Sequence, residues 1–176
     1  MPDNTPLAKQ IYDTAHITGE FTLRSGAKSN EYFDKYLFEA NPELLKHIAL
    51  AMVKLVPPGI DALAGLEMGG IPIATMLSQL TGLPVLFVRK KAKDYGTCKI
   101  AEGGQVSGRK LLIVEDVVTF GGAILDAAKA LREEGALLSG VVCVIDRESG
   151  GPANLAKADL KLTPLFTMSE LKKAGA

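Results

Sequence analysis

Residues 111–123, LLIVEDVVTFGGA, decide the fold of this chain. The first four are aliphatic and have the length and character of a buried strand in a parallel sheet. Two acids end that run, two valines link it to a Thr-Phe-Gly-Gly turn, and a helical pattern follows over residues 122–134. We therefore predict a strand, a glycine-rich turn and a helix, the arrangement in which α/β proteins hold phosphate.

The turn and the acids before it indicate different parts of one ligand. Glycines let the backbone approach an anion, the Thr119 hydroxyl adds a donor, and we expect unusual dihedrals at Gly121 and Gly122. Neither G-x-x-x-x-G-K-[ST] nor a G-x-G-x-x-G after a strand occurs. Glu115 and Asp116 would repel phosphate, so we expect them to face ribose hydroxyls or a metal ion. A plain strand–turn–helix with a polar end is the alternative, and it leaves the adjacent acids unexplained.

Composition bounds the class of protein. A chain of 176 residues suffices for a single domain over 1–176. With 20 basic and 20 acidic residues the formal net charge is zero, so bulk charge favours neither a nucleic-acid partner nor a membrane surface. Cys98 and Cys143 match no metal-binding spacing, and no signal peptide or membrane-spanning stretch is evident, which favours a reducing, cytoplasmic location.

Two further strands are expected beside the first. Residues 60–66 form a buried run that ends in a second glycine turn at 67–72 and continues as a helix, which Gly82 closes. Right-handed crossovers put both glycine turns at the carboxyl edge of one parallel sheet. A third run, 83–88, leads into RKKAKDYGT at 89–97. A charge run is usually a solvated face, but at this edge it is a candidate lid that could neutralise a diphosphate.

The remaining pattern predicts flanking elements. Helical spacing covers residues 6–18, a strand pattern surrounds Phe21, and Asn41 before a proline opens a helix. A strand over 137–145 ends at an Asp-Arg turn. Shorter elements are expected at 153–158, at 160–162 and from 169 onward. His16 and His47 have no partner motif, so histidine-based catalysis has little support.

Several of these segments together resemble a known family. The central stretch resembles the phosphoribosyl-diphosphate signature of the type I phosphoribosyltransferases. Within that family, three strings are similar to orotate phosphoribosyltransferases: F-x-L-x-S-G-x-x-S before Tyr32-Phe33, R-K-x-A-K-D-x-G at 89–96 and D-R-x-x-G-G at 146–151. With the turn at 67–72, five blocks match in order between residues 19 and 151.

The resemblance implies a fold and an activity. The fold would be a type I phosphoribosyltransferase-like α/β domain, with a mostly parallel central sheet flanked by helices and a small hood mainly from residues 1–40. The enzyme would transfer the phosphoribosyl group from 5-phosphoribosyl diphosphate to orotate, giving orotidine monophosphate and diphosphate in pyrimidine biosynthesis. Mg²⁺ would be held mainly by the diphosphate, with no protein ligand certain. The protein would be a homodimer that shares its lids, with neither nucleic-acid nor membrane partners.

The resemblance also implies roles for individual residues. The catalytic set would be Arg89, Lys93 and Asp116. The donor would be bound by Arg24, Gly69, Arg89, Lys90, Lys93, Tyr95, Glu115, Asp116, Val117, Val118, Thr119, Phe120, Gly121, Gly122 and Ala123. The base would be bound by Tyr32, Phe33, Thr119 and Arg147.

Four positions depart from the family pattern. Some members carry Lys where this chain has Gly69, and many carry His where it has Tyr95. Phe120 stands where a small residue is usual, and Ala123 lacks the common hydroxyl. Two alternatives share the central motif: a phosphoribosyltransferase for a purine or another base, and a non-catalytic nucleotide-binding regulator. The hood string and the D-R-x-x-G-G turn argue against the first, and the intact basic run argues against the second.

Overall fold

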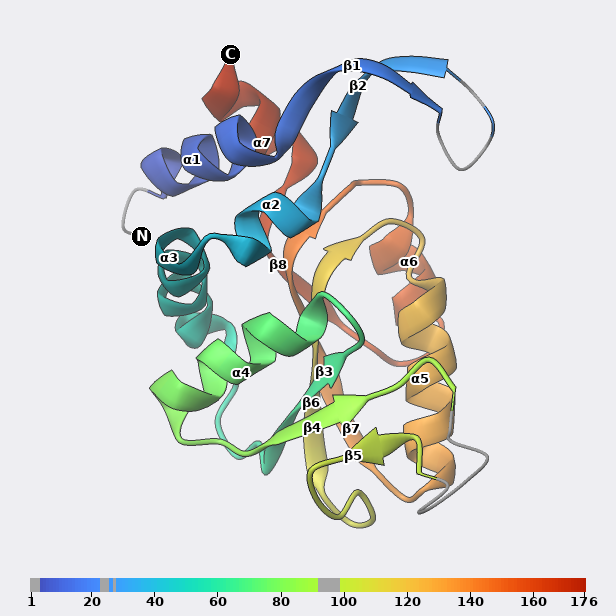
Figure 1. Ribbon diagram of the computed structural model, residues 1–176. Coiled ribbons are helices and arrows are strands. Elements are labelled where there is room, and N and C mark those ends of the chain that lie inside the picture. The colour runs from blue at the N-terminus through green and yellow to red at the C-terminus, as the bar shows by residue number, and fades with distance from the viewer. Residues whose placement is uncertain (1–3, 23–25, 27, 92–98) are drawn as a thin grey trace.

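A six-stranded sheet forms the centre of the computed structural model, which describes residues 4–22, 26, 28–91 and 99–176 (Figure 1). The strand order is β5-β4-β3-β6-β7-β8, and all pairs are parallel except β4 with β5. The strands are β3 (Ala62–Leu66), β4 (Val85–Val88), β5 (Ala101–Glu102), β6 (Lys110–Val118), β7 (Leu137–Asp146) and β8 (Leu162–Thr167). The expected mostly parallel sheet is confirmed.

Helices cover both faces of this sheet, and a hairpin lies beyond its carboxyl edge with α1 and α7 (Figure 1). The hairpin pairs β1 (His16–Thr22) with β2 (Lys28–Phe33) in antiparallel fashion and forms the hood. The helices are α1 (Thr5–Ala15), α2 (Lys35–Ala40), α3 (Pro42–Met52), α4 (Gly70–Thr81), α5 (Gly122–Glu133), α6 (Gly151–Ala156) and α7 (Met168–Gly175), with a 3-10 turn η1 (Val53–Leu55) after α3.

The aliphatic run of β6 is buried on both sides because successive side chains point to opposite faces. Leu111 and Ile113 belong to the apolar cluster that includes α5 and α6. Leu112 and Val114 belong to the cluster formed with α1, α3, α4 and α7. A strand that is buried on both faces has apolar residues at every position. The continuous apolar run at 111–114 therefore indicated a central strand of the sheet.

β6 extends four residues beyond the predicted end, so the prediction that Glu115 and Asp116 end the strand is wrong. The last pair between β3 and β6 is Gly65 with Val114. On the other side, β7 continues to pair with β6 as far as Val118. The acids therefore lie within a strand that has lost one neighbour, and the pleat gives each of them a different face.

Other boundaries also differ. The first helix ends at Ala15, and His16 already begins β1. The last strand is β8, which starts where the predicted one at 160–162 ends, and α2 and β5 were not predicted. The expected start of α3 is confirmed, because Asn41 Oδ1 accepts a hydrogen bond from the Leu44 amide at 3.1 Å. Gly82 ends α4 with a φ of +74°.

Gly70 allows α4 to pack directly against β6. A Cβ at Gly70 would lie 2.3 Å from the Val114 carbonyl oxygen. The same contact sets where the second glycine turn meets the end of β6. Position 70 therefore accepts no side chain without a backbone shift.

We predict that Gly70→Ala lowers the free energy of unfolding by about 1–3 kcal/mol, the usual cost of overpacking. Gly122→Ala is the matched control, because Gly122 also begins a helix but a Cβ there meets nothing within 4 Å. Urea denaturation of both variants measures the difference. Equal stabilities would show that α4 is free to move away from β6.

Candidate active site

The phosphate turn lies at the carboxyl edge of the sheet, where β6 passes into α5. A hollow of about 310 Å³ opens there. It is lined by Glu115, Val117, Val118, Thr119, Phe120, Gly121, Gly122, Ala123 and Ile124. The structure thus brings together all the residues predicted to surround the phosphate, and one of the two acids with them.

The turn itself is built around a single left-handed residue. Gly121 has a φ of +82° and precedes α5, whose N-terminus no side chain caps. The expectation of unusual dihedrals at both glycines holds for Gly121 only, since Gly122 is already the first residue of the helix. The Phe120 carbonyl accepts a hydrogen bond from Asn154 Nδ2 at 3.1 Å, which ties the turn to α6. Uncapped amides and the dipole at a helix N-terminus are features that favour an anion.

The two acids take different environments. Glu115 lines the phosphate hollow, and its Oε1 accepts a hydrogen bond from the Asp116 amide at 3.1 Å. Asp116 is fully buried, and its Oδ2 forms an ion pair with the Lys35 ammonium of α2. A carboxylate buried this deeply requires such a partner. Lys35 was not among the predicted site residues, because it lies in the short helix α2, which no sequence pattern indicated.

A second missed residue, Glu39, completes a buried cluster with Glu115, Asp116 and Lys35. Burial, followed by hydrogen bonding to Asp116 and the charge of Asp116, raises the pKa of Glu39 to about 8. Burial and the same neighbour raise the pKa of Glu115 well above its usual range. Burial opposes ionisation of Asp116 too, but hydrogen bonds with the other three groups hold its pKa below the ordinary value.

Lys35 keeps its proton in this cluster. Burial alone would lower the pKa of Lys35, yet the hydrogen bond and charge of Asp116 outweigh burial and raise it. The Lys35 ammonium thus supplies the counter-charge that the buried Asp116 carboxylate requires.

The second glycine turn closes over this cluster. The Glu67–Met68 peptide bond is cis, and Gly69 follows it. A Cβ at Gly69 would lie 1.7 Å from Asp116 Oδ2 and 2.8 Å from Glu39 Oε1. The departure at position 69, where some members of the resembled family carry Lys, therefore has a steric reason, because the two carboxyl groups fill that space.

The basic run begins beside this turn. The Lys90 amide donates a hydrogen bond to Glu67 Oε1 at 2.6 Å, and the Arg89 amide donates one to the Ile100 carbonyl at 2.9 Å. Arg89 Nε is buried without a hydrogen-bond partner among the described residues. Three predicted donor-binding residues, Arg24, Lys93 and Tyr95, lie outside the described part of the chain.

A second hollow, of about 210 Å³, brings together Tyr32, Phe33 and Arg147, three of the residues predicted to bind the base. Its other lining residues are Tyr12, His16, Ser29, Glu31, Met168 and Lys172. Thr119, also predicted for the base, lines the phosphate hollow instead. The two hollows are joined through the backbone, because the Arg147 amide donates a hydrogen bond to the Val118 carbonyl at 2.8 Å.

His16 was not expected in this place, because no sequence motif accompanies it. Its Nε2 lies 2.9 Å from Glu31 Oε2, and its ring stacks on Tyr12. The hydrogen bond to His16, and then the charge of Lys172, lower the pKa of Glu31. His16 is thus held by its neighbours at the wall of the Arg147 hollow.

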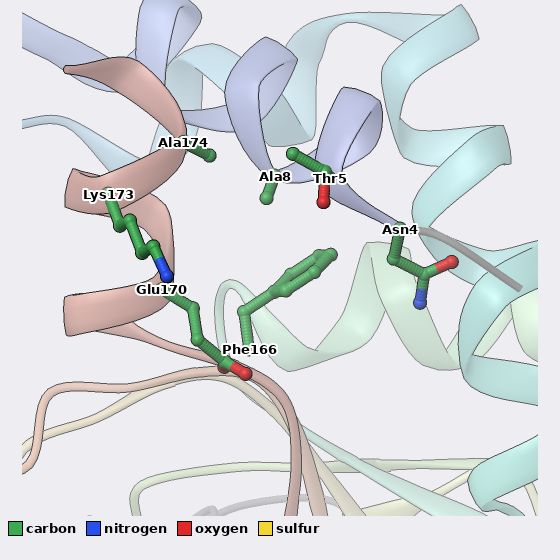
Figure 2. A pocket seen from close by; sticks show the side chains of 7 residues that line it. All are labelled: Asn4, Thr5, Ala8, Phe166, Glu170, Lys173 and Ala174. Atoms are coloured by element: carbon green, nitrogen blue, oxygen red, sulfur yellow. The ribbon is translucent and has the colours of Figure 1, made fainter. Parts of the chain in front are cut away.

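Another hollow, of about 360 Å³, lies between α1, β8 and α7 (Figure 2). Phe166 projects into it, and Glu170 and Lys173 border it from α7. It contains none of the predicted site residues. Within the described residues, no helix is long and apolar enough to cross a membrane, and no group of three or more His, Cys, Asp and Glu side chains could hold a metal ion.

Comparisons with known proteins agree with this geometry. The model of the phosphoribosyl transferase domain matches residues 38–163. An orotate phosphoribosyltransferase of Nocardioides sp. is 56% identical over 173 residues, covering 97% of each chain. An orotate phosphoribosyltransferase of Methanocella arvoryzae is 44% identical and covers 96% of this chain and 97% of its own.

A solved structure has the same architecture. The orotate phosphoribosyltransferase of Mycobacterium tuberculosis, in complex with 5-phospho-α-D-ribosyl 1-diphosphate, superposes with a TM-score of 0.83 at 26% identity. The match covers 97% of this chain and 99% of that one. The type I phosphoribosyltransferase fold is therefore confirmed for this chain.

Proposed function

This chain belongs to the orotate phosphoribosyltransferases, and from that membership we propose how its residues carry the transfer. The enzyme moves the phosphoribosyl group of 5-phosphoribosyl diphosphate to orotate, with orotidine 5-monophosphate and diphosphate as products. One observation supports our assignment of the site above all others. The uncapped turn at 119–121 and Glu115 face one hollow, and the Arg147 hollow lies next to it along β6 and β7.

The donor is held by backbone amides and carboxyl groups. The amides of residues 119–123 bind the 5-phosphate at the start of α5, where the helix dipole favours an anion. Glu115, which lines the hollow, accepts hydrogen bonds from the ribose hydroxyls, and Asp116, buried beside it, contributes negative charge. The backbone at Gly69 contacts the diphosphate, with Arg24, Lys90 and Tyr95 as further contacts assigned from the resemblance.

Orotate is held in the Arg147 hollow. Tyr32 and Phe33 lie against the ring, and Thr119 reaches the base from the phosphate turn. The Arg147 guanidinium meets carboxylate and carbonyl oxygens together, because it presents donors in a planar fork. A purine lacks that carboxylate, so this arginine favours orotate over a purine.

Catalysis is positioning and charge stabilisation, with no nucleophile from the protein. A ring nitrogen of orotate attacks the anomeric carbon as the bond from that carbon to the diphosphate oxygen breaks. Asp116 stabilises the positive charge that develops at the anomeric carbon, while Arg89 and Lys93 neutralise the departing diphosphate. Exclusion of water prevents hydrolysis of the donor.

Mg²⁺ fits this site as an ion that would bind together with the diphosphate. Asp116 is engaged by Lys35 and by the Val117 amide, which leaves Glu115 as the acid with a carboxyl group facing the hollow. Glu115 would hold the ion through its water or by one oxygen, and the diphosphate would supply most ligands. When bound, the ion adds positive charge that weakens the bond to the leaving group.

The cell compartment and the assembly are also proposals. An enzyme of nucleotide synthesis with a buried free thiol at Cys143 suits the cytoplasm. The protein forms a homodimer in which the basic run of one subunit serves the site of the other. The dimer rests on the resemblance, since members of the family share their sites in this way. The basic residues from Arg89 to Lys93 follow β4 in the sequence.

Incubation with 5-phosphoribosyl diphosphate, Mg²⁺ and a panel of bases tests the function. We expect diphosphate release with orotate and none with adenine, guanine or hypoxanthine. Release with a purine would favour a purine phosphoribosyltransferase. Donor binding without release for any base would favour a nucleotide-binding regulator of the same fold.

We predict that Arg147→Ala weakens orotate binding by about 10- to 150-fold, since hydrogen bonds to charged groups contribute about 1.5–3 kcal/mol. Donor affinity, measured by calorimetry, should change far less. Arg147→Lys keeps the charge but loses the fork, and it should recover only part of the loss. Equal losses for both ligands would mean that Arg147 supports the fold rather than the base.

We predict that two inactive variants complement each other in a mixed dimer. Lys93→Ala removes a basic side chain from the run, and Asp116→Asn disables the ribose side of the site. Each should be nearly inactive alone, but random subunit exchange should restore up to about a quarter of wild-type activity, because half the dimers then hold one intact site. Verified mixed dimers without recovery would show that each basic run serves its own subunit.

A further inference from the structure

Two cations line the Arg147 hollow, and only one of them has an assigned role. Arg147 reaches the hollow from the turn after β7, and Lys172 reaches it from α7. Within the described part of the chain, neither side chain forms an ion pair with a carboxylate. Positive charge without a counter-ion at the wall of a hollow favours an anionic ligand there.

Glu31, a carboxylate that lines the same hollow, does not balance both cations. Its Oε2 lies 2.9 Å from His16 Nε2. That hydrogen bond is the largest cause of the lowered pKa of Glu31, and the charge of Lys172 is the next largest. Lys172 therefore lies close enough for its charge to act within the hollow. With His16 counted as neutral, the described lining residues leave one positive charge unbalanced.

The helix that carries Lys172 is fixed to the turn that carries Arg147. Glu148 follows Arg147 directly, and its Oε2 accepts a hydrogen bond from the Ser169 amide of α7 at 2.9 Å. Leu171, next to Lys172, is fully buried in the core that α7 shares with α1. Both cations thus come from parts of the chain that are tied to each other, an arrangement that preorganises them for one ligand.

We propose that Lys172 is a specificity-determining residue whose ammonium contacts the orotate carboxylate together with the Arg147 guanidinium. This inference rests on the proposed binding of orotate in the Arg147 hollow. Orotate carries one carboxylate at neutral pH, which matches the unbalanced positive charge of the hollow. Arg147 offers a planar fork to carboxylate and carbonyl oxygens, and Lys172 adds a point charge with three rotatable donors. A pyrimidine without the carboxylate gains nothing from Lys172.

The adjacent Lys173 provides a matched control. Both lysines are exposed and lie in the last turn of α7, where a positive charge also complements the helix dipole. Lys173, however, lines the hollow between α1, β8 and α7 (Figure 2). An effect on the helix alone would therefore appear at both positions, whereas contact with the orotate carboxylate would appear at Lys172 only.

Affinities for orotidine 5-monophosphate and uridine 5-monophosphate test the proposal, because the two nucleotides share the ribose phosphate and differ only in the carboxylate of the base. Calorimetric titration of wild-type protein, Lys172→Met and Lys173→Met gives the ratio of the two affinities for each protein. Methionine keeps most of the apolar stem and removes the charge. Thermal melting of each variant verifies that it is folded.

We expect Lys172→Met to weaken binding of orotidine 5-monophosphate by about 5- to 10-fold. This loss is smaller than for a buried hydrogen bond between charged groups, because Lys172 is exposed to water. The affinity of Lys172→Met for uridine 5-monophosphate should stay within about twofold of wild type, as is usual for a surface substitution. Lys173→Met should leave both affinities unchanged.

The outcomes separate the two levels of inference. Wild-type protein that binds neither nucleotide overturns the proposed function. Equal wild-type affinities for the two nucleotides overturn recognition of the carboxylate, and this inference with it. A wild-type preference for orotidine 5-monophosphate that persists unchanged in Lys172→Met overturns the role of Lys172 alone. Equal losses for both nucleotides in that variant, or the same loss in Lys173→Met, also overturn it, because the lysine would then act on the fold and not on the carboxylate.

Discussion

The burial of one carboxylate, that of Asp116, determines how the parts of this protein meet. A fully buried ion needs a counter-charge and hydrogen bonds, and these come from outside the sheet. Lys35 enters from α2, the helix that follows the hood, and Gly69 leaves space from the turn before α4. The hood, the central strand and the second glycine turn are therefore fixed relative to one another by a single group.

The geometry of β6 places the adjacent residues Glu115 and Asp116 in different environments. β6 extends beyond its last pair with β3 but remains paired with β7, so both acids lie within the pleated strand. Glu115 is directed to the phosphate hollow, and Asp116 is directed to the cluster with α2. A loop at this point would leave both side chains free to turn toward the ligand. In a strand, the Glu115 side chain points to the open side of the sheet, and the Asp116 side chain points to the opposite side, toward α2.

Local signals made much of the fold predictable, and long-range contacts account for the rest. The aliphatic run of β6, the Asn41 cap and Gly82 each carry their structural reason within a few residues. The end of β6 depends on β7, which lies about 20 residues away in sequence. Lys35 and Glu39 belong to a six-residue helix with no periodic signal, and their importance appears only when Asp116 is placed beside them. The phosphate turn was predictable because it is carried by a contiguous string, whereas the Arg147 hollow combines residues from α1, β2, the turn after β7 and α7.

The shared space above Gly69 also constrains how relatives can diverge. A Cβ at position 69 would lie 1.7 Å from Asp116 Oδ2 and 2.8 Å from Glu39 Oε1. A relative that carries a side chain there must therefore hold both carboxyl groups elsewhere, and losing the acid at position 39 would not suffice. The tolerance of this turn to substitution is thus set by two residues that lie 30 and 47 positions away in the sequence.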